Sequence, residues 1–318
     1  MDVLDPTHPD DAQRQPGDYR GRLAPTPTGY LHLGHAYAFS IAAARSRAAG
    51  GALLMRIENI DRQRCRQAFT EAALADLRWL GLHWDEGPDV GGPFEPYVQS
   101  ARMAWYREVW AMLRDRGLVY PCTRSRREIE AHAKLATSAA AGVAGSADTP
   151  GAVDADELDA EPLFPRQWRP PGGTGSGASE PGRCNWRLRV PDGEVIAFED
   201  RRLGAVSHRA GCDFGDFLVW RRDDAPSYEL AVVADDFAMR ISEAVRGADL
   251  LRSTSRQLLL YRALDWKPPA FYHVPLLRDD SGRRLAKRFD SLAVRTLRDA
   301  GYTPEAVLAR ARALAEGR

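Results

Sequence analysis

The chain has 318 residues, of which 44% are hydrophobic and 28% are charged, and this is the composition of an ordinary globular protein. Its 44 basic and 44 acidic residues cancel, which excludes a general polyanion-binding coat and leaves only a local basic face. The length allows two domains or one large interrupted domain.

The N-terminal residues and the cysteines indicate where the protein works. Residues 1–18 are polar and acidic, lack the apolar core of a signal peptide, and predict a disordered tail. No apolar run approaches the length of a membrane span. The four cysteines form no CxxC pair, which favours a reducing compartment. We expect a cytoplasmic monomer with no membrane partner.

The chain is organised around residues 22–35, Arg-Leu-Ala-Pro-Thr-Pro-Thr-Gly-Tyr-Leu-His-Leu-Gly-His. Residues 19–24 are short enough for one strand, and the alanine-rich residues 36–49 suit a helix. The apolar run 52–58 then ends in an acid and predicts a second strand. This order predicts a βαβ unit with parallel strands, whose ligands bind at the carboxyl ends of the strands.

Two histidines mark the start of the predicted helix. His32 and His35 are three residues apart, so they share one helix face where backbone N–H groups and the helix dipole favour an anion such as phosphate. Gly34 lies between them and would let a flat ring approach the backbone. An isolated pair with this spacing is more typical of a surface or metal-binding site, so the surrounding residues decide between that interpretation and an anion-binding site.

The rest of the chain predicts alternating helices and strands. Helices are expected at 68–82, 100–117, 255–264 and 304–316, and strands at 186–190, 195–198, 216–222, 228–233 and 273–277. A Pro-Asp-Gly turn joins the first two strands as a hairpin, and the apolar run 228–233 is typical of a buried parallel strand. Residues 133–183 are rich in Ala, Gly, Ser and Pro and predict a flexible segment, with an apolar island at 161–169 that packs back.

Several single residues have both a functional and a structural interpretation. Glu58 at a strand end could bind an amine, or could simply pair with a neighbouring arginine. Arg246 before a glycine could hold a carboxylate through two contacts near Tyr228, or could form a structural salt bridge beside a core tyrosine. Lys287 in a polar loop suits a clamp on phosphates, or is only a solvated charge.

The stretch 22–35 resembles the first signature of class I aminoacyl-tRNA synthetases in their glutamyl and glutaminyl form. Residues 56–62, 228–236 and 245–250 also match family segments, and residues 283–288 resemble the second signature. The resemblance covers residues 19–288 apart from the insertion. Asn59 and Ala286 replace a family aspartate and serine, whereas Thr26 replaces a serine but keeps the hydroxyl.

The resemblance implies an α/β fold with a Rossmann-type catalytic domain and a definite set of site residues. The implied glutamate-binding residues are Arg22, Leu23, Ala24, Pro25, Thr26, Glu58, Tyr228 and Arg246. The residues implied for ATP are His32, Gly34, His35 and Lys287, with His32, His35 and Lys287 as the catalytic ones. Activation would proceed by in-line attack of the amino-acid carboxylate on the α-phosphate, which needs placement and charge stabilisation more than acid–base catalysis.

The resemblance also implies the organisation of the chain. The expected segments are a tail at 1–18, the first catalytic half at 19–101, an acceptor-binding-like insertion at 102–202, the second catalytic half at 203–264, and a signature loop with C-terminal helices at 265–318. Full glutamyl-tRNA synthetases continue with an anticodon-binding region, so the sequence resembles their short paralogues. These paralogues use ATP and Mg²⁺ to activate glutamate and place it on the queuosine base in the anticodon loop of tRNA(Asp).

Three alternatives remain open. The chain could be a truncated glutamyl-tRNA synthetase that charges a tRNA 3′ end, or a catalytically inactive glutamate- and ATP-binding paralogue. It could also be a small-molecule nucleotidyltransferase that shares the HxGH turn, although Tyr228 and Arg246 argue against this. Glutamate-dependent pyrophosphate exchange would separate the two synthetase interpretations from the inactive paralogue and the nucleotidyltransferase.

The insertion of the short relatives carries a zinc site with the pattern Cys-x-Cys and then Tyr-x-x-x-Cys. Here Cys122 matches the first ligand, but Arg124, Phe164 and Trp168 occupy the other positions. One thiolate is too few for structural zinc, which takes four ligands, and we expect Phe164 and Trp168 to pack in place of the metal.

We predict that the purified protein carries no stoichiometric zinc, because its sequence retains one of the four family ligands. Elemental analysis of the protein after dialysis measures this directly. One tightly bound zinc per chain would contradict the prediction and would assign ligands elsewhere, for example to His132 or Cys184.

Overall fold

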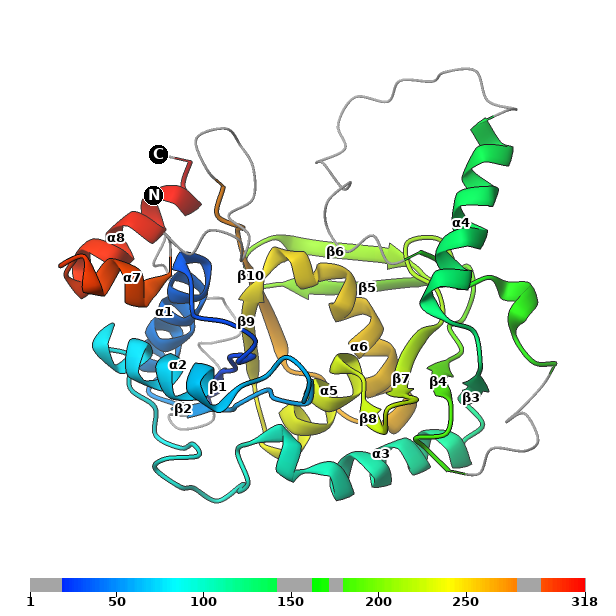
Figure 1. Cartoon of the computed structure of the whole chain (residues 1–318), viewed down its shortest axis with the longest axis horizontal. Coiled ribbons are helices and arrows are strands. Elements are labelled where there is room, and N and C mark those ends of the chain that lie inside the picture. The colour runs from blue at the N-terminus through cyan, green and yellow to red at the C-terminus, as the bar shows by residue number, and fades with distance from the viewer. Residues whose placement is uncertain (1–18, 142–161, 172–179, 279–292, 318) are drawn as a thin grey trace.

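The computed structural model describes residues 19–141, 162–171, 180–278 and 293–317 (Figure 1). The predicted tail, most of the segment predicted to be flexible, and the loop that contains Ala286 and Lys287 lie outside these residues. Residues 133–141 were predicted to be flexible but continue helix α4 (Arg126–Ala141), because an alanine-rich run forms helix readily. None of the described helices is long and apolar enough to span a membrane.

The predicted βαβ unit is confirmed. Strand β1 (Arg20–Leu23) pairs in parallel with β2 (Ala52–Met55), with Arg20 opposite Ala52 and Leu23 opposite Met55. Helix α1 (Leu33–Ala48) connects the two strands and packs its buried side against them. Helices α2 (Gln67–Trp79), α7 (Val294–Asp299) and α8 (Pro304–Ala315) complete this end of the molecule (Figure 1).

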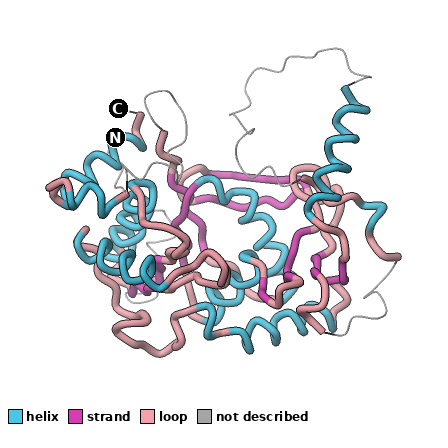
Figure 2. The backbone as a smooth tube through the Cα atoms, viewed as in Figure 1, coloured by secondary structure: helices cyan, strands magenta, loops and turns pink. Residues whose placement is uncertain are grey.

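A second sheet has the strand order β6-β5-β10-β9. Its strands are β5 (Val195–Asp200), β6 (Gly204–Arg209), β9 (Glu243–Gly247) and β10 (Ala270–Val274), with η5 (Ala248–Leu250) and α6 (Leu251–Leu264) between the last two. The long pair β5–β6 crosses the upper middle of Figure 2. Strand β10 is parallel to both β9 and β5.

The first strand of the βαβ unit lies beside β9. The backbone N–H of Ser242 donates to the carbonyl of Arg20 at 2.9 Å, and the Arg22 guanidinium donates to the carbonyl of Val245 at 3.0 Å. Strands β1 and β9 are thus neighbours. From β1 the chain continues to β2 on one side of this pair, and from β9 it continues to β10 on the other side. Such a reversal of strand order is where ligands of open α/β sheets bind, at the carboxyl ends of the strands.

A third sheet has the order β3-β4-β7-β8 and is antiparallel. Its strands are β3 (Val119–Cys122), β4 (Asn185–Leu188), β7 (Phe217–Arg221) and β8 (Ala225–Pro226). Helix α3 (Met103–Asp115) follows the turn η2 (Gln99–Ala101), and η4 (Arg166–Trp168) lies near α4 in the insertion. The strand pairings cross the expected boundary at residue 202, since β5 lies before it and pairs with β10, while β7 lies after it and pairs with β4.

Two of the predicted strand arrangements differ from the structure. The expected hairpin does not form, because β4 pairs with β3 and β7 whereas β5 pairs with β6 and β10. A Pro-Asp-Gly turn signals a change of direction but does not choose the partner of a strand. The strand expected at 273–277 is β10, which begins at Ala270 and ends at Val274.

The run 228–233 is a helix, not a buried parallel strand. Helix α5 (Tyr228–Ala238) begins at Ser227, whose hydroxyl accepts the backbone N–H of Leu230 at 3.2 Å and caps the helix. Every residue from Glu229 to Asp236 is buried, since α5 is covered on all sides. A short, uniformly apolar run fits a buried strand and a buried helix equally well, and only packing decides.

Candidate active site

A cavity of about 650 Å³ opens at the carboxyl ends of β1, β9 and β10, beside the start of α1. Most of the predicted site residues line it: Arg22, Ala24, Thr26, His32, Gly34, His35, Glu58, Tyr228 and Arg246. Of the predicted site residues that the structure describes, two do not. Leu23 is fully buried in the core, and its carbonyl accepts the backbone N–H of Arg56, while the carbonyl of Pro25 accepts that of Glu58 at 3.0 Å.

The two histidines form the cap of α1. His32 is the N-cap, where its Nδ1 accepts the backbone N–H of Gly34 at 3.1 Å, and His35 Nδ1 accepts the backbone N–H of His32 at 3.2 Å. Their ring centroids are 3.8 Å apart. Because each Nδ1 is an acceptor, a neutral ring carries its hydrogen on Nε2 and acts there as a donor. This tautomer suits an anionic oxygen at the helix N-terminus.

Gly34 makes this cap possible. A Cβ at this position would lie 2.9 Å from Cε1 of the His32 ring, which is closer than real Cβ contacts. The glycine therefore lets the His32 ring fold over the first turn of the helix. This reason for the glycine concerns the histidine itself, whereas the sequence suggested only space for a ligand ring.

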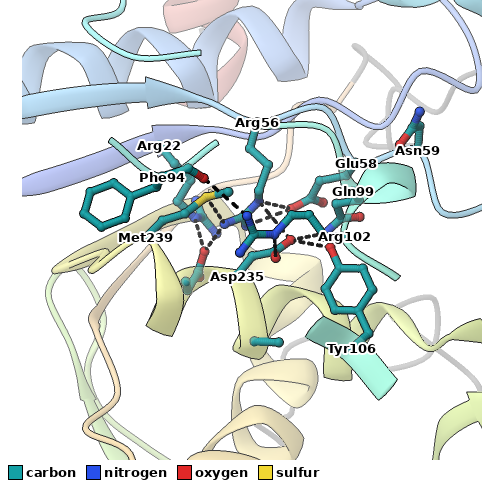
Figure 3. A network of polar contacts seen from close by, with 12 residues as sticks. Arg22, Arg56, Glu58, Asn59, Phe94, Gln99, Arg102, Tyr106, Asp235 and Met239 are labelled. Carbon is teal, nitrogen blue, oxygen red and sulfur yellow. Dashed lines mark hydrogen bonds and ion pairs between the residues drawn. The ribbon is translucent and has the colours of Figure 1, made fainter. Parts of the chain in front are cut away.

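A buried network of charges lies beneath Glu58 (Figure 3). Arg56 is fully buried and donates to Glu58 at 2.9 Å and to Asp236 at 2.6 Å. Burial raises the pKa of Glu58, although Arg56 and Arg22 oppose the shift. Burial acts in the same direction on Asp236, but there Arg56 and Arg22 prevail and hold the pKa below its usual value. Glu58 is thus the carboxylate of this group that takes up a proton more readily.

Asp235 extends the network toward α3. Its two carboxylate oxygens accept from Arg102 at 2.6 Å, from Gln99 at 2.9 Å and from the hydroxyl of Tyr106 at 2.8 Å. Asn59 lies apart from these contacts in Figure 3, and its side-chain oxygen accepts the backbone N–H of Ser100 at 2.9 Å. An asparagine keeps this acceptor at the position where the sequence resemblance implies an aspartate.

Arg246 lies on the other wall of the cavity and is buried. Its Nη2 donates to the Thr254 hydroxyl at 2.7 Å and its Nε to Nε2 of His273 at 3.3 Å. Its Nη1 has no hydrogen-bond partner among the described residues. An unpaired buried donor costs about 1–3 kcal/mol, more when charged, so this atom favours a ligand acceptor. Burial raises the pKa of the nearby Tyr228 hydroxyl, which therefore stays protonated.

Part of the cavity wall was not predicted from the sequence. Residues 274–277 line it because the chain leaves β10 at Val274, whereas the sequence predicted continued strand. Asp249 also lines the cavity, and a Cβ on Gly247 would lie 2.4 Å from its carboxylate oxygen. The only sequence signals were Pro275, which ends a strand readily, and the position of Asp249 in the segment matched at 245–250.

The region matched to the zinc site is a hydrophobic cluster. Cys122 and Phe164 are buried there with Tyr120 and Ile129, and Trp168 packs against them. The Arg124 guanidinium lies 4.6 Å from the centre of the Trp168 ring. The packing of Phe164 and Trp168 is confirmed, and within the described ranges no group of three or more His, Cys, Asp or Glu side chains could hold a metal. The zinc content of the protein stays a prediction.

Comparison with known proteins adds independent information. The family "tRNA synthetases class I (E and Q), catalytic domain" matches residues 19–315. The Glutamyl-Q tRNA(Asp) synthetase of Nitratidesulfovibrio vulgaris is 47% identical over 89% of this chain and 82% of its own length. The corresponding protein of Symbiobacterium thermophilum is 45% identical, with 91% and 84% covered.

Longer proteins are also similar. Glutamate--tRNA ligase 2 of Alkalilimnicola ehrlichii is 38% identical over 92% of this chain but only 58% of its own length. The crystal structure of a glutamate tRNA ligase from Elizabethkingia meningosepticum superposes with a TM-score of 0.67 at 26% identity. That match covers 90% of this chain and 53% of the ligase, so this chain spans about half of it.

We predict that Asp235→Asn destabilises the fold by about 3–5 kcal/mol, because it leaves the buried Arg102 without its carboxylate. Urea denaturation measures the change. The matched control is Asp223→Asn, which removes a half-exposed carboxylate paired with Arg221 and should cost at most about 1 kcal/mol. Equal small losses in the two variants would mean that the network contributes no more than a surface pair.

Proposed function

The chain belongs to the class I tRNA synthetases of the glutamyl and glutaminyl type, and from this premise we propose that it activates glutamate with ATP and Mg²⁺ and transfers it to the queuosine base of tRNA(Asp). The observation that carries the proposal is the unpaired, buried Nη1 of Arg246 in the same cavity as the buried Glu58. Because the reaction consumes ATP and tRNA, we place it in the cytoplasm.

The charges of the cavity are complementary to glutamate, which carries two carboxylates and one ammonium group. Arg22 and Arg246 are buried guanidinium groups for the carboxylates, and Glu58 is the carboxylate for the ammonium. Arg22 is held by the Val245 carbonyl at 3.0 Å and by Asp236 at 3.5 Å, so its orientation is set before the ligand arrives. Charge-assisted contacts of this kind are roughly twice as strong as neutral hydrogen bonds.

ATP would bind at the start of α1. The helix dipole and the Nε2 donors of His32 and His35 favour phosphate oxygens there. A carboxylate oxygen of glutamate then forms a bond to the α-phosphorus as the bond to pyrophosphate breaks. By the family resemblance, Lys287 would stabilise the negative charge on the same phosphates. Alignment and charge stabilisation supply the acceleration of such a step.

The acceptor assignment depends on the comparisons. The two similar Glutamyl-Q tRNA(Asp) synthetases are 45–47% identical to this chain over more than four fifths of their length. The glutamate--tRNA ligase of Alkalilimnicola is 38% identical over 58% of its length. The greater identity and coverage favour the queuosine acceptor over a tRNA 3′ end, which is the second candidate.

We predict that labelled glutamate is transferred to queuosine-containing tRNA(Asp), weakly to tRNA(Asp) that lacks queuosine, and not to tRNA(Glu). Periodate oxidation of the 3′-terminal ribose before the reaction should leave the transfer intact, because the acceptor is a base in the anticodon loop. If intact tRNA(Glu) accepts glutamate and oxidised tRNA(Asp) does not, the chain is instead a glutamyl-tRNA synthetase.

We predict that the KM for glutamate rises as the pH falls toward the raised pKa of Glu58, because the protonated carboxyl no longer binds an ammonium group. Glu58→Gln should raise this KM by about 10- to 100-fold near neutral pH and abolish the further rise of KM at low pH. Pyrophosphate exchange at several pH values measures both effects. The exposed Glu71→Gln on α2 is the control and should change neither. An unaltered KM in Glu58→Gln would remove Glu58 from the glutamate site.

A further inference from the structure

We propose that Asp200 and His273 are positioning residues that orient the guanidinium of Arg246 through a fixed histidine tautomer and thereby set the affinity of the cavity for a substrate carboxylate. The proposal rests on the proposed function in one respect, namely that Arg246 binds a carboxylate of glutamate. Neither residue lines the cavity, so neither contacts the substrate.

The contacts form a chain from the edge of the sheet to the cavity. His273 on β10 is fully buried, and its Nδ1 lies 2.6 Å from Oδ2 of Asp200 at the end of β5. Its Nε2 lies 3.3 Å from Nε of Arg246 and 2.9 Å from the hydroxyl of Thr254. Thr254 in turn accepts from Nη2 of Arg246 at 2.7 Å. Two of the guanidinium nitrogens are thus held, and Nη1 is left for a ligand.

The carboxylate of Asp200 fixes the tautomer of His273. Hydrogen bonds from His273 and from the backbone N–H groups of residues 202 and 203 lower the pKa of Asp200 in spite of its burial, so it is an acceptor only. The hydrogen of the imidazole is therefore on Nδ1, and Nε2 presents a lone pair. The Nε–H of Arg246 needs such an acceptor. The tautomer with hydrogen on Nε2 would instead direct the N–H of His273 at the N–H of Arg246.

The neutral ring also leaves the charge of Arg246 available. Burial lowers the pKa of His273 to about 4, and Arg246 acts in the same direction, against Asp200 and Asp249, so the ring is uncharged near neutral pH. Arg246 makes no direct hydrogen bond to a carboxylate within the described residues. A carboxylate in direct contact would compete with the substrate for the guanidinium, whereas an imidazole nitrogen orients it without neutralising it.

The first test is Asp200→Asn. The asparagine keeps one acceptor oxygen for the backbone N–H groups, but its amide can donate to Nδ1 and so favours the tautomer with hydrogen on Nε2. We expect the KM for glutamate in pyrophosphate exchange to rise by about 10- to 100-fold, with the KM for ATP unchanged. A loss that affects kcat and both KM values equally would indicate a merely structural role and overturn the proposal.

The second test substitutes the histidine itself. His273→Gln offers a carboxamide oxygen to Arg246 and should recover much of the glutamate affinity that His273→Leu loses. The matched control is His208→Gln on β6, because His208 contacts Ser255, the residue after Thr254 on α6, at 2.8 Å and does not line the cavity. This control should keep the wild-type KM. Equal KM values for His273→Gln, His273→Leu and the wild type would overturn the proposal.

Nitrogen NMR of the histidine-labelled wild-type chain gives a readout of the tautomer that does not depend on activity. The chain has 7 histidines, and the His273→Gln spectrum assigns the signal of His273. We expect hydrogen on Nδ1 at neutral pH, and finding it on Nε2 would overturn the proposal. If the wild type shows no glutamate-dependent exchange while this tautomer is observed, the proposed function fails and the Asp200–His273 geometry stands.

Discussion

The burial of one guanidinium group constrains the centre of this protein. Arg56 is fully buried at the end of β2, and such a charge is tolerated in a protein interior only beside carboxylates that it can reach. Two of these carboxylates, Asp236 and Asp235, come from α5, and the Asp235 oxygen lies 3.8 Å from Nε of Arg56. The third, Glu58, lies two residues after Arg56 in the chain. Removing one partner would leave the others as uncompensated charges, so β2 and α5 must pack in this one register.

The same ion network explains how the cavity acquires its polarity. Glu58 is tied to Arg56 at the base of the site, while Arg22 is held beside Asp236 and the β9 backbone. The proximity of β1 and β9 places the arginines of both strands, Arg22 and Arg246, on one cavity. A fold that needs charge pairs to join its two halves therefore also leaves Glu58, Arg22 and Arg246 facing a ligand in the cavity that Asp249 also lines.

How much of this could be predicted from the sequence depended on the range of the interaction. The βαβ unit and the position of the two histidines at the helix start follow from local spacing, and the family resemblance named nine of the residues that line the cavity. Helix α5 was missed because its burial on every side erases the helical period. The partners of Arg246 were missed because Asp200, Thr254 and His273 are brought together by strand pairing, and no local pattern connects them.

Three histidines show how the hydrogen-bond partner of Nδ1 assigns opposite roles to one side chain. In His32 and His35 the backbone donates to Nδ1, which leaves the hydrogen on Nε2 and makes each ring a donor for an anion. In His273 a carboxylate takes the hydrogen of Nδ1, which makes Nε2 an acceptor for Arg246. Both arrangements end in a donor directed at negative charge, the first through the imidazole and the second through the guanidinium that it orients. A substrate that brings a phosphate and a carboxylate together meets both at the same cavity.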